Sequence, residues 1–142
     1  MRINIKWSLF VILGLLCCSS YALNHEEQVL TQLAQRQGFF FFFSSSCPHC
    51  QRFSPVLKQI SQRYGFQVVA ISMDGGYLPE FNNAVLDEGQ SKLFKVTVYP
   101  SLFLVDPKRE NAHLVTEGAI GAEELLQRLI KISQSKDSQV AS

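Results

Sequence analysis

The chain has 142 residues, of which 46% are hydrophobic, and its formal net charge at neutral pH is +1. That is enough apolar sequence for the core of one domain. The near balance of 13 basic and 12 acidic residues argues against nucleic-acid binding and against attachment to an anionic membrane surface by charge.

The first 22 residues have the pattern of a secretory signal. Arg2 and Lys6 precede an apolar stretch, and Ser20-Tyr21-Ala22 places small residues at the two positions that a signal peptidase inspects. We predict that residues 1–22 are cleaved off, that the protein is periplasmic, and that it has no stable membrane insertion afterwards. The alternatives are a lipoprotein attached at Cys18 and a retained anchor, for which the uncharged run is short.

A helix and a buried strand are predicted next. Asn24 and Glu27 have the spacing of a capping box, and apolar residues at helical spacing follow as far as Gly38. Phe39–Phe43 is too short for a helix and aromatic throughout, which predicts a central strand buried on both faces. An aggregation-prone patch or an extension of the signal is the alternative, but Gly38 and Ser44–Ser46 mark the limits of a strand.

A second helix is predicted to start at Cys47-Pro48-His49-Cys50. Proline is tolerated in the first helical turn, and the apolar pattern continues to Tyr64 before Gly65. The N–H groups and partial positive charge of a helix N-terminus favour a thiolate at Cys47. We therefore expect Cys47 to be the nucleophile and Cys50, one turn further on, to be the resolving thiol of a thiol–disulfide exchange reaction.

Half of a zinc site and an inert disulfide are the alternatives for this cysteine pair. Structural zinc sites use four nitrogen or sulfur ligands, and the sequence has no second CxxC. A disulfide across so short a loop would constrain little of the chain. We expect a redox-active pair that uses no metal and no cofactor. His49 is expected to donate to the Cys47 thiolate or to place positive charge beside it.

The rest of the chain alternates strands and helices. A strand is predicted at Phe66–Ser72 and a turn at Asp74-Gly75-Gly76, whereas residues 77–87 have no readable pattern. The later predicted elements are a short helix after Asp87, strands at Ser101–Val105 and Ala112–Glu117, and a helix with Leu125, Leu126, Leu129, Ile130 and Ile132 on its buried side.

This order predicts an α/β fold with a small mixed sheet, parallel in part, with an antiparallel hairpin at its edge and helices on both faces. Residues 23–135 form the predicted domain. Residues 136–142 form a polar tail, and we expect fraying from Ser133 onward.

A CxxC that opens a helix after a buried strand, Pro55 within that helix, and a later Pro100 before a hairpin together resemble thioredoxin. The similarity covers roughly residues 24–131. In the thioredoxin superfamily the later proline is cis and lies beside the dithiol, so the resemblance implies a cis Pro100 that binds substrate. Tyr99 is then either part of the same substrate-binding groove or a packing residue. The Pro48-His49 dipeptide is the one found in the periplasmic oxidase DsbA.

Three stretches resemble, more narrowly, the TraF/TrbB group of thioredoxin-like proteins from conjugative type IV secretion systems: Cys47–Leu57, Ser72–Gly76 and Pro100–Pro107. Members that keep both cysteines are associated with disulfide exchange or isomerisation during pilus assembly. The resemblance implies an oxidoreductase or isomerase whose partners are cysteine-containing exported proteins, among them pilus or secretion-channel components. A structural or chaperone-like component with a dispensable CxxC, and a dedicated reductase, are the alternatives.

The sequence departs from thioredoxin in one respect. Thioredoxins often carry a buried acid in the strand beneath the dithiol, which helps to deprotonate the second cysteine. Phe39–Phe43 contains no ionisable residue, so the group that accepts the Cys50 proton stays unassigned at this point.

Overall fold

The computed structural model describes the backbone of residues 25–140 and the side chains of residues 25–135. The predicted signal peptide, the cysteine at position 18 and the predicted helix cap at Asn24 lie outside this range. Within it, no helix combines the length and the apolar character that crossing a membrane requires.

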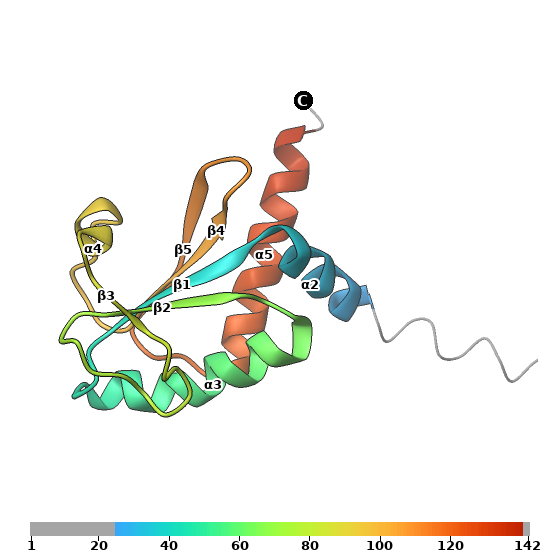
Figure 1. The fold of residues 1–142 in the computed structure, drawn as a ribbon. Coiled ribbons are helices and arrows are strands. Elements are labelled where there is room, and N and C mark those ends of the chain that lie inside the picture. The colour runs from blue at the N-terminus through green and yellow to red at the C-terminus, as the bar shows by residue number, and fades with distance from the viewer. Residues whose placement is uncertain (1–24, 141–142) are drawn as a thin grey trace, which may run out of the picture.

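Helices and strands alternate along the chain, as the sequence predicted (Figure 1). In order they are helix α2 (His25–Arg36), strand β1 (Gly38–Phe43), helix α3 (Pro48–Tyr64), strands β2 (Val68–Ser72) and β3 (Val85–Leu86), helix α4 (Gln90–Leu93), strands β4 (Ser101–Asp106) and β5 (Asn111–Glu117), and helix α5 (Ala122–Val140).

The five strands form one mixed sheet in the order β3-β2-β1-β4-β5. Strands β1, β2 and β3 are parallel, whereas β4 pairs antiparallel with β1 and β5 antiparallel with β4. This confirms the predicted mixed sheet with its hairpin. Strand β3 was not predicted, because two residues are too few to show an alternating pattern. Strand β2 starts at Val68, two residues later than predicted, and Phe66 before it packs its ring against Phe39 at 4.5 Å between centroids.

The phenylalanine run is the central strand, and its side chains alternate between the two faces. Phe39, Phe41 and Phe43 are fully buried in the main core. That core includes, from the helices, Leu30, Leu33, Phe53, Leu57, Ile60, Leu125 and Leu129. Phe40 and Phe42 point to the opposite face, and Phe42 is also fully buried. The predicted burial on both faces is confirmed, with Phe40 half-buried.

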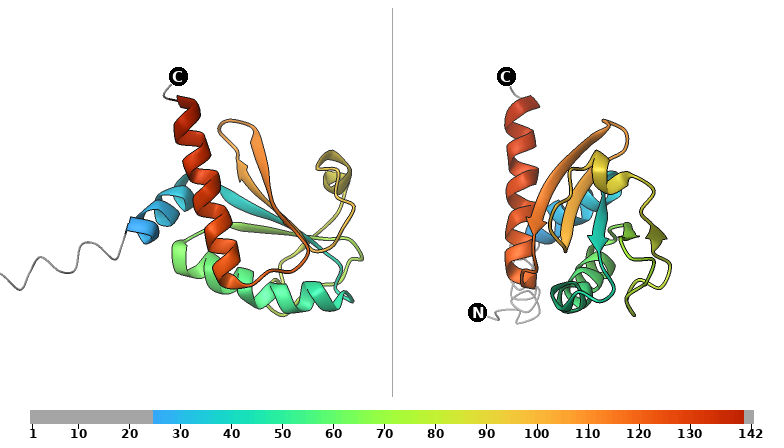
Figure 2. Two further views of the ribbon diagram at one scale, coloured as in Figure 1. Left: turned by 180° about the vertical axis from the view of Figure 1, so that it is seen from behind. Right: turned by 90° about the vertical axis from the view of Figure 1, so that its left-hand side faces the viewer.

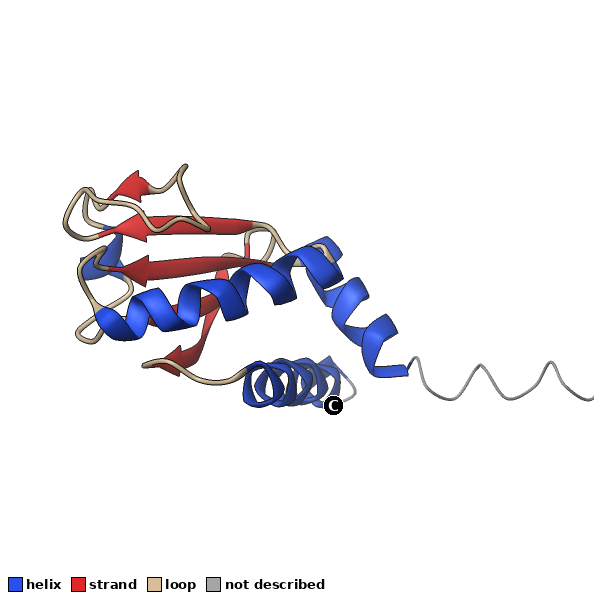
Figure 3. Cartoon of the chain, turned by 90° about the horizontal axis from the view of Figure 1, so that it is seen from below, coloured by secondary structure: helices blue, strands red, loops and turns tan. Residues whose placement is uncertain are grey.

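The two faces of the sheet are covered unequally. Helices α3 and α5 lie on one side of it, in contact with each other and with α2 (Figures 2 and 3). Within the described part of the chain, the short helix α4 covers the other face. Its C-cap residue, Phe94, packs its ring against the rings of Phe40, Phe42 and Phe103. This second cover is thinner than expected, and Val69 on that face is 43% exposed.

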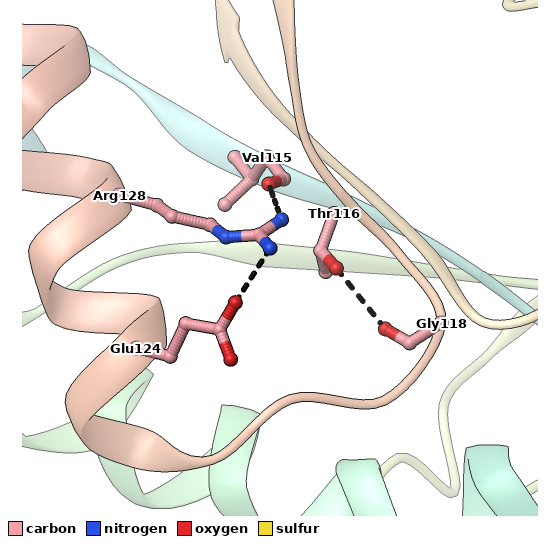
Figure 4. Close-up of polar contacts among 5 residues, drawn as sticks. All are labelled: Val115, Thr116, Gly118, Glu124 and Arg128. Carbon is pink, nitrogen blue, oxygen red and sulfur yellow. Dashed lines mark hydrogen bonds and ion pairs between the residues drawn. The ribbon is translucent and has the colours of Figure 1, made fainter.

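Helix α5 is fixed to the sheet by both apolar and polar contacts. Arg128 donates to the backbone oxygen of Val115 in β5 at 2.9 Å and to Glu124 one turn earlier at 2.6 Å (Figure 4). The backbone of α5 stays helical to Val140, so the fraying expected from Ser133 is not seen in the described residues. No glycine or proline interrupts this end of the helix, and its serine, glutamine and lysine residues tolerate helical geometry.

Candidate active site at the start of helix α3

Cys47 is the N-cap of α3, directly after the serines that follow β1. Its backbone is extended, with φ −79° and ψ 118°, which is the usual N-cap conformation. Its sulfur accepts a hydrogen bond from the Cys50 N–H at 3.3 Å, where the side-chain oxygen of a serine or aspartate would normally do so. Pro48 occupies the first turn, where its missing N–H has no consequence. The predicted helix start is therefore confirmed.

The two cysteines differ in exposure. Cys47 is half-buried, Cys50 has no exposed surface, and both are free thiols. Cys47 is therefore the more accessible of the two cysteines to another protein. Among the side chains of residues 25–135, no cluster of three or more His, Cys, Asp or Glu is placed to bind a metal ion.

The pKa of the Cys50 thiol is raised to about 12, first because burial disfavours the charged form and second because of its hydrogen bond with Cys47. A backbone hydrogen bond from Ser44 favours the thiolate and offsets only part of this rise. At neutral pH Cys50 is therefore a thiol, and it needs a proton acceptor when it reacts.

The segment before β4 lies beside Cys47. The Cys47 sulfur is 3.9 Å from the backbone oxygen of Tyr99, and the Tyr99–Pro100 peptide bond is cis, as the thioredoxin resemblance implied. Pro100 is buried and its carbonyl accepts from the Gly118 N–H at 2.7 Å, while Tyr99 is half-buried. The structure thus brings together residues 52 positions apart, and their role in substrate binding stays a prediction.

His49 is exposed in the first turn of α3, and the hydrogen bond that the structure shows for its ring is with Arg52. The guanidinium Nη2 lies 2.6 Å from His49 Nδ1. Because arginine can only donate, Nδ1 is the acceptor in this contact. Arg52 adds a positive charge to this helix end, and the sequence analysis did not single it out. Its i, i+3 spacing from His49 would have been the signal.

The carboxylate of Glu80 lies against helix α3 on the face that carries Cys50. Ser54 lies one turn beyond Cys50, has no exposed surface, and donates to the carboxylate of Glu80 at 2.7 Å. This pair brings a carboxylate to the helix face that carries Cys50, although β1 itself has none. Glu80 was missed because it lies in residues 77–87, where the sequence shows no periodicity.

Comparison with known proteins gives a family match over most of the chain. The TraF family model, described as "F plasmid transfer operon protein", matches residues 18–130. Protein TraF of Escherichia coli (strain K12) is 27% identical over 109 residues, which cover 77% of this chain and 44% of TraF. Protein TrbB of the same organism is 33% identical over 97 residues, which cover 66% of this chain and 54% of TrbB. The chain therefore spans about half the length of these relatives.

Solved structures share the architecture. A putative thiol:disulfide interchange protein DsbE from Chlorobium tepidum matches with a TM-score of 0.56 at 23% identity, covering 73% of this chain and 84% of that one. The fold is thioredoxin-like, as the sequence resemblance predicted.

Proposed function

Because this chain belongs to the TraF family, we propose that it is an exported thiol–disulfide oxidoreductase of a conjugative transfer system. Its clients in this proposal are cysteine-containing proteins of the pilus or the secretion channel, encountered in the periplasm after removal of residues 1–22. The names of the relatives TraF and TrbB support the link to plasmid transfer.

One observation supports the chemistry above all others. A half-buried cysteine caps the N-terminus of a helix, and a second, fully buried cysteine lies directly behind it. The N–H groups and dipole of α3 stabilise negative charge on Cys47, which is what a nucleophilic sulfur requires. Cys50 is fully buried and its N–H donates to the Cys47 sulfur, which fits the role of the resolving partner.

The proposed reaction follows from this asymmetry. The Cys47 thiolate attacks a client disulfide, forms a mixed disulfide and releases one client thiolate, which takes up a proton. Cys50 then loses its proton to solvent and attacks the Cys47 sulfur, and the second client sulfur leaves as a thiolate that takes up a proton from solvent. The client gains two electrons and two protons in total, and the Cys47–Cys50 disulfide remains. The same steps in reverse oxidise a client, and no cofactor is needed because the dithiol carries both electrons.

The remaining residues have supporting roles in this proposal. Tyr99 and Pro100 form the groove in which the client chain lies against Cys47. Pro48 sets the helix start, and His49 with Arg52 supplies polar contacts and positive charge at the helix end that carries the half-buried Cys47. Isomerisation would follow the same first step, after which a second cysteine thiolate of the client attacks the mixed disulfide and releases Cys47 as a thiolate, without net oxidation of the pair.

A complementation experiment in the natural host tests the cellular role. We expect a strain that lacks this gene to lose conjugative transfer and to regain it with the wild-type gene. A Cys47→Ser/Cys50→Ser double variant is expected to leave transfer at the level of the deletion, because both sulfurs of the exchange reaction are absent. Mating frequency is the readout, with an immunoblot to show equal protein levels.

Full transfer with the double variant would instead favour a structural or chaperone-like component whose CxxC is dispensable. Alkylation of cysteines in the wild-type strain distinguishes the direction of electron flow. A mainly oxidised Cys47–Cys50 pair fits an oxidase, and a mainly reduced pair fits an isomerase or a dedicated reductase.

A further inference from the structure

Asp74 lies beside the residues that lead into the active site, although it is 27 positions after Cys47 in the sequence. Strands β1 and β2 are parallel neighbours in which Phe43 pairs with Ser72, so both strands end at the same edge of the sheet. The Met73 N–H continues the pairing with a 2.9 Å hydrogen bond to the Phe43 carbonyl. The residues that follow the two strands are therefore brought together: Ser44–Ser46, called here the serine loop, and Asp74.

The Asp74 carboxylate accepts five hydrogen bonds. Its Oδ2 accepts from the Ser44 hydroxyl, the Ser45 hydroxyl and the Ser45 N–H, each at 2.9 Å. Its Oδ1 accepts from the Ser72 hydroxyl and the Gly76 N–H, both at 3.1 Å. Desolvation raises the pKa of this carboxyl, but the hydrogen bonds from Ser45, Ser44 and Gly76 outweigh it and hold the pKa well below its ordinary value. Asp74 is thus a charged acceptor shared by two segments.

The backbone around Asp74 is shaped to approach the serine loop closely. A Cβ atom at Gly76 would lie 2.2 Å from the Ser45 Oγ and 2.6 Å from the Ser45 Cβ, so a side chain at that position would displace the loop. Gly75 has φ +77°, a conformation that glycine adopts without strain. The turn predicted at Asp74-Gly75-Gly76 is confirmed, and it packs directly on the loop that precedes the dithiol.

The other side of the serine loop contacts the dithiol and the first turn of α3. The Cys47 N–H donates to the Ser44 carbonyl at 3.2 Å, and the Gln51 side-chain amide donates to the Ser45 carbonyl at 2.9 Å. The Ser44 backbone also forms the hydrogen bond to the Cys50 sulfur that favours its thiolate. The loop therefore connects Asp74 on one side with both cysteines on the other.

We propose that Asp74 is a positioning residue for the redox pair, which holds the serine loop so that the two sulfurs stay at the separation needed to close a disulfide. This inference rests on the proposed function, because it assigns a role within the same site. Asp74 touches neither sulfur and is not a proton acceptor in the reaction, since its oxygens are already occupied by five donors.

The proposal predicts the direction of a redox effect. The relevant equilibrium is protein dithiol plus oxidised glutathione giving protein disulfide plus two reduced glutathione molecules. An Asp74→Asn variant keeps one acceptor oxygen, but in either orientation its NH2 group, which donates, faces a backbone N–H that cannot accept, that of Ser45 or that of Gly76. The loop loosens, the effective concentration of Cys50 at Cys47 falls, and disulfide closure becomes less favourable. Loss of the negative charge stabilises a Cys47 thiolate in the reduced form and acts in the same direction.

We therefore expect the equilibrium constant for disulfide formation with glutathione to fall about tenfold in Asp74→Asn, which is about 30 mV for a two-electron couple. The matched control is Asp87→Asn. Asp87 is also a turn carboxylate that accepts from a serine N–H and hydroxyl, those of Ser91, but its bonds are to α4 rather than to the serine loop. The control should keep the wild-type equilibrium constant.

A second variant separates positioning from charge. Ser44→Ala/Ser45→Ala removes two donors to Asp74 but keeps its charge, and it should lower the equilibrium constant in the same direction. Circular dichroism on each purified protein shows whether it is folded. A wild-type equilibrium constant in Asp74→Asn would overturn the proposal. A lower equilibrium constant in Asp74→Asn but not in the serine variant would also overturn it, because the effect would then come from the charge of Asp74 and not from positioning. If the wild-type protein itself forms no reversible disulfide, the proposed function is wrong, and the inference about Asp74 is wrong with it.

Discussion

Replacing Cys50 with serine is expected to make the protein accumulate mixed disulfides with its substrates, whereas replacing Cys47 with serine is expected to abolish exchange. The two outcomes differ because the half-buried Cys47 is the sulfur that substrates can reach, and the fully buried Cys50 is the sulfur that releases them. A serine hydroxyl at position 47 is not a nucleophile at neutral pH, so exchange should fall by on the order of a hundredfold or more.

Both variants can be measured with a disulfide-bonded peptide as the substrate. In Cys50→Ser, mass spectrometry should detect an adduct that dithiothreitol removes. In Cys47→Ser, alkylation of the remaining Cys50 should be slow at pH 7 and should become faster as the pH rises, because burial, the largest cause, still raises the pKa of this thiol. Rapid labelling of Cys50 at pH 7, or an adduct that forms on Cys50 and not on Cys47, would reverse the assignment of the two roles.

The largest effect on stability is expected at Phe41. This side chain is fully buried in the central strand, and its ring lies 5.3, 5.8 and 5.5 Å from the rings of Phe43, Phe53 and Phe81, measured between centroids. Phe41→Ala removes these contacts and leaves a cavity between the sheet and α3, so we expect a loss of about 3–5 kcal/mol. Since small domains are stable by only about 5–15 kcal/mol, we expect much of this variant to unfold in mild denaturant.

Urea denaturation followed by circular dichroism measures this loss. The matched control is Leu93→Ala, because Leu93 is also apolar but is 79% exposed, and its truncation should change the free energy of unfolding by less than about 0.5 kcal/mol. Equal losses in the two variants would contradict the placement of Phe41 at the centre of the core.

The sequence predicted those parts of the molecule that depend on local patterns. Five consecutive phenylalanines between Gly38 and the serines favoured a strand that is buried on both sides, and a CxxC followed by an apolar helical pattern indicated a helix start. The prediction that the Tyr99–Pro100 bond is cis came from the resemblance to thioredoxin and not from a local pattern, because most X–Pro bonds are trans. Its position beside Cys47 depends on the antiparallel pairing of β4 with β1.

Other features depend on contacts that no local pattern encodes. Strand β3 has two residues and exists because it pairs with β2. Glu80 forms its hydrogen bond with Ser54, 26 positions away, and Asp74 forms its bonds with the serine loop, 29 and 30 positions away. In the sequence, Glu80 and Asp74 therefore look like ordinary loop residues. Asp74 could have been suspected from one rule, because residues after neighbouring parallel strands meet at the same edge of the sheet. Applied to β1 and β2, that rule places Asp74 near the cysteines.

The reduction potential of the Cys47–Cys50 pair, measured against glutathione buffers, tests the central claim most directly. The single tryptophan, Trp7, lies in the predicted signal, so thiol alkylation and mass are the appropriate readouts. We predict a reversible disulfide with a potential between about −120 mV, as in a strong oxidant, and about −270 mV, as in thioredoxin, with about −180 mV typical of an isomerase. A pair that forms no disulfide at any glutathione ratio, or one with a potential below about −300 mV like a structural disulfide, would contradict the account.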